Sequence, residues 1–577
     1  MKKKTLSYIL CGLAGCIIFF TLIRLTKPTN AIGSKRDELY ENYSEPVLGV
    51  YDRNKKMTNE KVAAFKHFTI KWNDSQEDKP VQKQLSNILK EKQDILLTVE
   101  MWSERGEAYA PHGILQGMVD GEYDKKIIAL CSSLAAGKNN IYLRWNPEME
   151  VPVQKYQWQN QSVFLYANAF CHFAGLCKKL APAAKIVWGP LGYAGALEYW
   201  PGSDAADFAC ITLNNLPASL SPQYPAEKSI PVQIKRKLHR LRFIDKPIFI
   251  LGSEEVKKDN FNNQWIEAAI QDIRKDTAII YSQKNFVRPD SANINGGGIH
   301  LLLGMYDPGK QLINQPLVGI EHIFADWGNI QDGTFRKIFN GVISRNHNVI
   351  VTIEPWKSKN HTGDRDVLNN TLNGSYDTII KELYNIISNV KQTVYLRWAH
   401  EMEIPVDRYF WQNQDPVTYI KAYRYVMKFN KNKAKNIRNV WGPTGDRGAL
   451  DFWPGNDVVD YISIAIYGLP NKDITDPDLQ ESFSTIFKRK YSRMSFVNKP
   501  VFITEFGVKG SQAFKRKWLK DAAATINENP RIAGVCYFNF SDVPKAWGKI
   551  EPPDWSITKE TFQHFTSELK QVKQKRG

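Results

Sequence analysis

Short apolar runs alternate along the chain with longer stretches in which apolar residues recur at a helical period. In the first half, such runs stand at 95–100 (ILLTVE), 140–145 (NIYLRW), 185–190 (KIVWGP) and 247–252 (PIFILG). Near-continuous apolar strands separated by helices are typical of a parallel sheet that is buried on both faces. The pattern therefore predicts an α/β fold in which helices cover a parallel sheet.

This pattern occurs twice. RWNPEME at 144–150 returns as RWAHEME at 397–403, an offset of 253 residues, and the same offset joins EYWPGSDAADF at 198–208 to DFWPGNDVVDY at 451–461. A repeat of about 250 residues is too long for a solenoid unit and matches the usual size of a one-domain (β/α)8 barrel. The chain is therefore predicted to contain a duplicated domain.

Strand ends can be placed in the second copy from the polar residues that follow each apolar run. They fall near residues 307, 326, 354, 401, 442, 467, 505 and 539. Parallel strands at this spacing close a (β/α)8 barrel. We expect two tandem TIM barrels, at 46–295 and 299–577, with the glycines Gly296, Gly297 and Gly298 between them.

The N-terminus predicts a transmembrane helix in front of the barrels. Lys2, Lys3 and Lys4 precede an apolar run from Leu6 to Leu25, which is close to the roughly 20 residues that cross a bilayer. We expect a membrane anchor at 1–26 and a polar linker at 27–45, with the barrels outside the inner membrane. An alternative is a lipoprotein, because Leu13-Ala14-Gly15-Cys16 resembles a lipobox, but the apolar IIFFTLI after Cys16 favours the uncleaved anchor.

Composition excludes some classes of partner. Lys and Arg outnumber Asp and Glu by 77 to 60, a net charge of +17, yet the excess is spread along the chain without a nucleic-acid-binding motif. Seven cysteines, an odd number without a CxxC pair, argue against a zinc site or a disulfide framework. We expect no nucleic acid, metal or cofactor. The 16 Trp residues are compatible with binding of a sugar chain.

Two glutamates follow strand ends in the second copy. Glu401 comes directly after YLRWAH, at the end of the predicted fourth strand, and Glu505 comes directly after VFIT, at the end of the seventh. Functional groups of such barrels lie at the carboxyl ends of the strands. Two carboxylates over one barrel mouth suit glycoside hydrolysis, in which one group protonates the leaving oxygen and the other attacks the anomeric carbon.

The second copy resembles glycoside hydrolase family 26, which is best known for β-mannanases. The residues that carry the resemblance are Arg397-x-x-His400-Glu401, the segment 451–461 that leads to Tyr467, and Thr504-Glu505-Phe506-Gly507. The resemblance implies a retaining mechanism, with Glu401 as the general acid/base and Glu505 as the nucleophile. It also implies that His400 contacts the sugar and that Tyr467 donates a hydrogen bond to the nucleophile, while Arg397 is expected to hold that carboxylate in its ionised form.

Aromatic side chains near the predicted mouth are candidates for stacking on sugar rings. Trp356 follows the third strand, Trp411 lies past the acid/base and Trp547 follows the eighth strand. Trp441 and Trp453 are interpreted as core residues. Glu403 shares its place with Glu150 of the first copy, and a structural hydrogen bond common to both copies explains the pair.

The first copy has lost part of this set. Glu148 matches Glu401, but Pro147 stands for His400, Asn214 for Tyr467 and Gly252 for Glu505. Glu254 and Glu255 come next, but two strand residues span about 6.6 Å, which is too far for a direct replacement.

A barrel without its nucleophile is predicted to be catalytically silent, although Arg144 and Trp158 remain at its mouth. We interpret the first copy as a binding module or spacer. The complete set predicts a membrane-tethered, retaining endo-β-glycanase that cleaves a polysaccharide through the second barrel. The alternative is a non-catalytic polysaccharide-binding or exopolysaccharide export-associated protein. The oligomeric state stays open.

Overall fold

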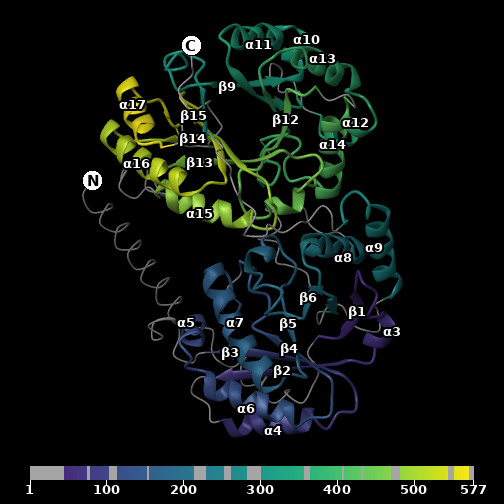
Figure 1. Cartoon of the computed structure of the whole chain (residues 1–577). Helices are drawn as coiled ribbons and strands as arrows, with labels where there is room; N and C mark the ends of the chain where they lie inside the picture. The colour runs from purple at the N-terminus through teal and green to yellow at the C-terminus, as the bar shows by residue number, and fades with distance from the viewer. Residues whose placement is uncertain are drawn as a thin grey trace, which may run out of the picture.

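The protein folds into two lobes that correspond to the two sequence copies (Figure 1). The computed structural model describes residues 45–73, 78–102, 113–152, 155–213, 229–252, 262–282, 300–356, 364–405, 408–430, 434–469, 481–542 and 551–570. The predicted anchor, and the linker as far as residue 44, lie outside the described residues. Within the described ranges, no helix is both long enough and apolar enough to cross a bilayer.

The second copy forms the predicted closed barrel of eight parallel strands. In chain order the strands are β8 (Leu302–Tyr306), β9 (Ile320–Asp326), β10 (Asn348–Glu354), β11 (Val394–Trp398), β12 (Ile437–Trp441), β13 (Tyr461–Gly468), β14 (Val501–Val508) and β15 (Ile532–Phe538). Each strand pairs with the next, and β15 closes the barrel on β8. The strand ends predicted from polar residues are confirmed to within a few positions.

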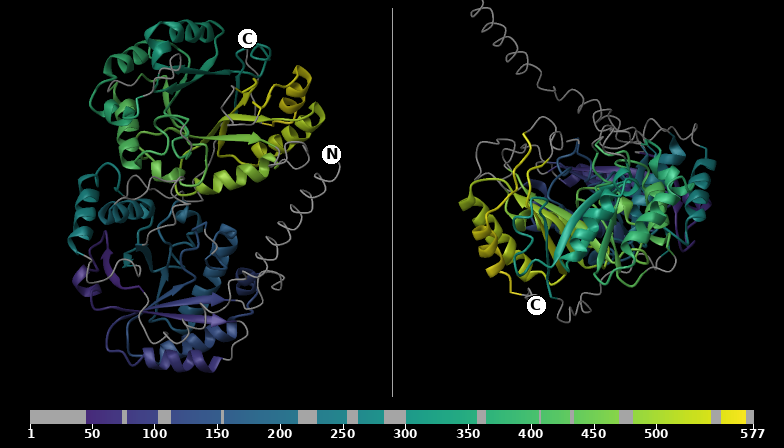
Figure 2. Two further views of the ribbon diagram at one scale, coloured as in Figure 1. Left: turned by 180° about the vertical axis from the view of Figure 1, so that it is seen from behind. Right: turned by 90° about the horizontal axis from the view of Figure 1, so that it is seen from above.

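Amphipathic helices surround this barrel (Figures 1 and 2). They are α10 (Trp327–Gln331), α11 (Thr334–Ser344), α12 (Val367–Leu372), α13 (Asp377–Ile387), α14 (Pro416–Lys428), α15 (Phe483–Arg493), α16 (Gln512–Glu528) and α17 (Lys559–Ser567), with the 3₁₀ turn η7 (Ala449–Phe452). Side-chain caps start several of them, because a hydroxyl or carboxylate can accept from a free amide of the first turn. Asp415 accepts from Thr418 N ahead of α14, and Ser511 accepts from Phe514 N ahead of α16.

A ring of buried side chains fills the interior of the barrel. Ile350, Tyr395 and Phe502 come from three different strands and form one cluster. Successive side chains of a strand point to opposite faces, so these positions face inward while their neighbours pack under the helices. This packed cluster lies below the mouth of the barrel and fixes the strand ends that carry the candidate site.

The described residues of the first copy form an open sheet of seven strands, so the prediction of a second closed barrel is wrong. The strands are β1 (Val47–Tyr51), β2 (Lys66–Asn73), β3 (Ile95–Trp102), β4 (Ile141–Trp145), β5 (Lys185–Trp188), β6 (Phe208–Leu213) and β7 (Ile248–Gly252). Strands β2 to β7 are parallel and neighbour one another in chain order. The helical elements are α3 (Asn59–Val62), α4 (Asp78–Ile88), α5 (Gly113–Val119), α6 (Asp124–Ala135), α7 (Val163–Leu180), η1 (Ala196–Tyr199), α8 (Ile230–Arg240), η3 (Leu241–Phe243) and α9 (Gln264–Lys275).

Strand β1 forms one edge of this open sheet, directly beside β7, whereas β15 separates β14 from β8 in the closed barrel. Strand β1 pairs with β7 and runs antiparallel to it, with Val47 opposite Leu251 and Tyr51 opposite Ile248. Its counterpart β8 runs parallel to both of its neighbours. The matching letters LGVYD and LGMYD therefore form strands of opposite direction, and β1 does not bridge to β2 within the described sheet.

The two copies contact each other, and each contributes the equivalent surface to the interface. Arg240 Nε donates to Asp451 Oδ2 at 3.0 Å, and Arg493 Nε donates to Glu198 Oε2 at 3.0 Å. The two arginines are separated by the repeat offset, and so are the two acids. Reciprocal contacts of this kind define an isologous interface, as between the subunits of a twofold dimer.

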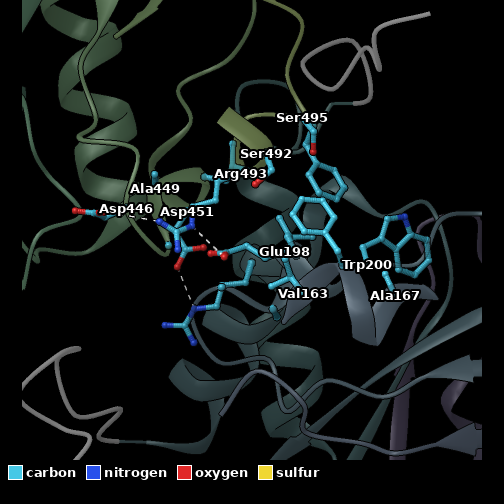
Figure 3. Close-up of a pocket in the computed structure, with 18 of the residues that line it drawn as sticks. Val163, Ala167, Glu198, Trp200, Asp446, Ala449, Asp451, Ser492, Arg493 and Ser495 are labelled. Carbon is cyan, nitrogen blue, oxygen red and sulfur yellow. Dashed lines mark hydrogen bonds and ion pairs between the residues drawn. The ribbon is translucent and has the colours of Figure 1, made fainter. Parts of the chain in front are cut away.

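Equivalent residues also meet each other at this interface. The rings of Phe243 and Phe496 lie 5.8 Å apart, so they are close to the approximate twofold axis. A pocket lies beside them, lined by both copies, with Glu198 reaching Arg493 across it (Figure 3). Its lining includes neither Glu401 nor Glu505.

Candidate active site

The loop that carries Glu401 has a strained backbone. After β11 ends at Trp398, Ala399 has a φ of 46° and Glu401 a φ of 57°. Residues other than glycine rarely adopt this left-handed region, and such strain gathers at functional sites. Glu401 N donates to Gly442 O at 2.8 Å, which holds the loop against the end of β12.

Glu505 lies inside β14, which continues three residues beyond it to Val508. Arg397 Nη1 donates to Glu505 Oε1, and Tyr467 Oη donates to Glu505 Oε2 at 2.9 Å. Both carboxylate oxygens are thus held by donors from other strands. Gly442 is required here, since a Cβ at that position would lie 2.4 Å from Arg397 Nε.

The two glutamates have opposite electrostatic environments. Burial raises the pKa of Glu401, the negative charge of Glu505 raises it further, and the pKa reaches about 7. Burial would also raise the pKa of Glu505, but the positive charge of Arg397 outweighs burial and lowers that pKa to about 2. At neutral pH, Glu505 is therefore ionised while Glu401 retains its proton in about half of the molecules.

Two buried histidines lie beside the carboxylates. His400 precedes Glu401, and its ring is 6.0 Å from that of Phe324. His322 donates to, or accepts from, Thr352 Oγ1 at 2.8 Å. Burial lowers the pKa of both histidines, and the positive charge of Arg397 lowers both further. The pKa of His400 lies well below its usual range, and that of His322 is about 3. Both rings are therefore neutral and can exchange hydrogen bonds with a polar ligand.

The tryptophans predicted to contact sugar differ in their exposure to solvent. Trp356 is partly exposed, and its Nε1 donates to Glu354 at 3.0 Å. Trp411 has no exposed surface, because Tyr409 stacks on it with ring centroids 4.5 Å apart. The prediction that Trp411 contacts substrate does not fit this burial. Its Nε1 donates to His400 O at 2.7 Å and so supports the loop that carries Glu401. Trp547 lies outside the described residues.

Several residues of the mouth were not singled out from the sequence. Tyr409 stands 5.3 Å from His400 between ring centroids, and the Arg408 guanidinium lies 4.7 Å from the Tyr409 ring. Trp555 packs against Tyr467 at 4.7 Å. The repeated KYQWQNQ and RYFWQNQ segments contain the signal for Tyr409, because a Tyr stands at the same place in both. Trp555 lies beyond the matched segments and has no such signal.

Glu403 has a structural role, as its recurrence in both copies indicates. Its Oε1 accepts from Thr444 Oγ1 at 2.7 Å and from Gly445 N at 3.0 Å. Glu150 accepts from the amides of Gly192 and Tyr193, each at 2.9 Å. In both copies these bonds tie the loop that follows the fourth strand, which carries Glu401 or Glu148, to the loop after the next strand. Within the described residues, no group of three or more His, Cys, Asp or Glu side chains is arranged to hold a metal ion.

Comparison with known families identifies this arrangement. Residues 352–532 match the model of glycosyl hydrolase family 26. The second copy contains a glycosyl hydrolase family 26 domain. The matched range contains Arg397, His400, Glu401, Tyr467 and Glu505, so the residues that converge at the barrel mouth all belong to the family 26 domain.

Curated relatives of this chain include Endoglucanase H of Acetivibrio thermocellus, which is 27% identical over 233 residues, 38% of this chain and 24% of the relative. Beta-1,3-xylanase TXYA of Vibrio sp. is 26% identical over 169 residues, 28% of this chain and 34% of the relative. The chain thus spans about a quarter to a third of the length of these relatives.

Solved structures similar to the chain include GH26C from Muricauda sp., at 12% identity and a TM-score of 0.37, with 47% of this chain and 86% of that chain covered. Another is a modular endo-β-1,4-mannanase from Cellulomonas fimi, at 16% identity and a TM-score of 0.33, with 47% of this chain and 71% of that chain covered.

Proposed function

We propose that the second copy, residues 299–577, is a retaining endo-β-glycanase that hydrolyses O-glycosidic bonds of a polysaccharide. The observation that carries the proposal is the pairing of an ionised Glu505, held by Arg397 and Tyr467, with a buried Glu401 whose pKa is raised to about 7. A nucleophile and a proton donor need these opposite states at the same pH.

In the first step, Glu505 attacks the anomeric carbon and forms a glycosyl ester. The bond from that carbon to the leaving oxygen breaks as Glu401 gives its proton to that oxygen. Tyr467 and Arg397 orient Glu505 for attack, and holding a reactive group in position removes much of the entropic cost of the reaction. His400 Nδ1 is buried and has no hydrogen-bond partner among the described residues, and the proposal assigns a sugar hydroxyl to it.

In the second step, water hydrolyses the ester. Esterification removes the charge of Glu505, so the pKa of Glu401 falls and its carboxylate can accept a proton from water. Water then attacks the anomeric carbon, the ester bond breaks, and Glu505 leaves as a carboxylate. Two displacements on one carbon retain the anomeric configuration.

A non-catalytic polysaccharide-binding or export-associated protein is the second candidate, because the first copy lacks the full set of site residues. The experiment compares the full chain with its Glu505→Ala variant on a panel of β-mannan, mixed-linkage β-glucan, β-1,3-xylan and the polysaccharide of the source cell. New reducing ends that form with the wild type, and at least about 10-fold more slowly or not at all with Glu505→Ala, support the hydrolase. Equal binding without cleavage by both proteins supports the second candidate.

The proposal includes a tether to the cell membrane with both copies on the extracytoplasmic side. It rests on the lysines at the N-terminus and the apolar run from Leu6 to Leu25. Fractionation of cells that express the full chain, or a chain that starts at residue 27, tests it: only the full chain should sediment with membranes. A Cys16→Ser variant that is released from the membrane would instead support the lipoprotein alternative.

A further inference from the structure

The mouth of the first copy contains a carboxylate at the place where the nucleophile was lost. Strand β1 runs antiparallel to β7, so the start of β1 lies beside the carboxyl end of β7. Gly252 N donates to Pro46 O at 2.8 Å. Gly252 is the residue that matches Glu505, and Glu45 directly precedes Pro46. The reversed strand therefore brings Glu45 to the strand end where the repeat has only a glycine.

Glu45 makes the ion pair that Glu505 makes in the second copy. Arg144 matches Arg397, and Arg144 Nη2 donates to Glu45 Oε2 at 3.2 Å. Arg144 is almost fully buried, with 3% of its side chain exposed, whereas Glu45 keeps 23% exposed toward solvent. His67 holds the backbone of this acid through a 2.8 Å hydrogen bond to Glu45 O. Glu45 is thus positioned by the same arginine and is accessible.

The loop of the matching acid is preserved contact by contact. Glu148 has a φ of 61°, the same left-handed strain as Glu401. Glu148 N donates to Gly189 O at 2.7 Å, and Gln159 Nε2 donates to Glu148 O at 3.0 Å. The corresponding bonds of Glu401 measure 2.8 and 3.1 Å. Strained backbone costs about 1–3 kcal/mol per residue, and a spacer has no need to retain it.

The aromatic side of the mouth is preserved as well. Tyr156 stacks on Trp158 with centroids 4.8 Å apart, as Tyr409 stacks on Trp411. Trp102 stands edge-on to Trp158 at 5.6 Å and is partly exposed, like Trp356. The first copy therefore offers the same stacking surface for a sugar ring beside its two carboxylates.

We propose that the first copy contains a second glycoside-cleaving site, in which Glu148 is the proton donor and Glu45 is the nucleophile. The inference rests on the hydrolase chemistry proposed for the second copy. Glu45 forms an ester with the anomeric carbon as the bond to the leaving oxygen breaks and Glu148 protonates that oxygen. Water then cleaves the ester, gives its proton to Glu148 and releases the Glu45 carboxylate.

The charges of the first copy agree with these roles. Burial raises the pKa of Glu148 and the negative charge of Glu45 raises it further, to about 7, while Arg144 lowers it. The second copy shows the same balance for Glu401. Pro147 replaces His400, and Asn214, which lies outside the described residues, replaces Tyr467. A lost hydrogen bond to a charged group costs about 1.5–3 kcal/mol, so we expect the first site to react at least about 10-fold more slowly.

Covalent labelling of the full chain tests the inference. The probes are the 2,4-dinitrophenyl 2-deoxy-2-fluoro-β-glycosides of cellobiose and mannobiose, whose leaving group departs without an acid, and the labelled peptides are identified by mass spectrometry. We expect rapid labelling of Glu505 and slower labelling of Glu45. Glu505→Gln should leave the label on Glu45 alone. Adding Glu45→Gln should remove it, while Glu60→Gln, an exposed acid on α3, should not.

The outcomes separate this inference from the proposed function. A label on Glu505 with none on Glu45, in the wild type and in Glu505→Gln, overturns the second site and leaves the proposed function standing. No label on either residue with both probes counts against a retaining mechanism in both copies. The Glu505→Gln chain retains the native first copy, so the result does not depend on whether the Glu45 variant folds.

Discussion

Glu148 and Glu401 lie in loops of the same conformation, but the first loop follows a strand of an open sheet and the second follows a strand of a closed barrel. In the second copy, the carboxylate opposite Glu401 comes from β14 and receives hydrogen bonds from Arg397 and Tyr467. In the first copy, the carboxylate opposite Glu148 is that of Glu45, two residues before the reversed β1, and it has Arg144 as its side-chain donor in the described structure. The electrostatic state of a buried acid thus depends on which charges face it and not on the strand that supplies those charges.

The nucleophile should dominate the activity of the second copy. In a chain that also carries Glu45→Gln, and so lacks the nucleophile inferred for the first copy, Glu505→Ala is expected to lower kcat on a cleaved β-glycan by about 10⁴-fold or more, the size of effect seen when a residue of a covalent-catalysis set is removed. Reducing-end assays measure it. Gly252→Glu in that background should not restore the rate, because Pro147 and Asn214 remain in the first copy. A rescue by that variant would contradict the assignment of the two mouths.

The two arginines of the interface should differ in their effect on stability. Arg240 and Asp451 keep only 6% and 8% of their side chains exposed, whereas Arg493 and Glu198 keep 16% and 13%. Removing one partner of a buried pair costs about 3 kcal/mol or more, and a more exposed pair costs less. Thermal unfolding should therefore show a larger loss for Arg240→Ala than for Arg493→Ala. Equal losses would mean that burial does not set the strength of these pairs.

Tyr467 donates a hydrogen bond to Glu505, and the first copy has Asn214 in place of this tyrosine. Tyr467→Phe should lower kcat by about 10- to 100-fold, since a hydrogen bond to a charged group contributes about 1.5–3 kcal/mol. The substitution removes one oxygen and preserves the packing against Trp555. Unchanged thermal stability with reduced kcat would show that the effect is on the reaction. An unchanged kcat would remove Tyr467 from the site.

The pH dependence should report Glu401. This acid must be protonated to act, and its pKa is raised to about 7. As pH rises through this value the proton is lost, so kcat/KM should fall about 10-fold per pH unit on the alkaline side. Glu505, with a pKa of about 2, stays ionised throughout this range. A profile that stays flat up to about pH 9 would contradict the raised pKa of Glu401.

Most of the second copy could be predicted from its sequence. Buried strands appear in the sequence as apolar runs. Polar residues at the ends of these runs, several of them repeated in both copies, predicted that Glu401, Glu505, Arg397 and Tyr467 lie around the mouth of one barrel. Such features are local, because a strand buried on both faces has to be apolar along its length. The burial of Trp411 could not be predicted in this way, since it depends on Tyr409 folding over the ring.

The open first sheet could not be predicted from the repeat. LGVYD and LGMYD are nearly identical, and strand direction depends on which neighbour offers a free edge and not on the strand's own letters. Comparison at a constant offset also could not find Glu45, because this residue precedes the matched segments and has no counterpart at a matching strand end. The anchor predicted from Leu6 to Leu25 stays a prediction, because it lies outside the described residues.

The reciprocal contacts between the copies have a consequence for assembly. A surface that binds its own duplicate is fully occupied once the two have met, so no third molecule can be added through it and no fibre can grow from it. Covalent linkage also keeps the local concentration of the partner high at any dilution. The association of the two lobes is therefore independent of how much of the protein a cell makes.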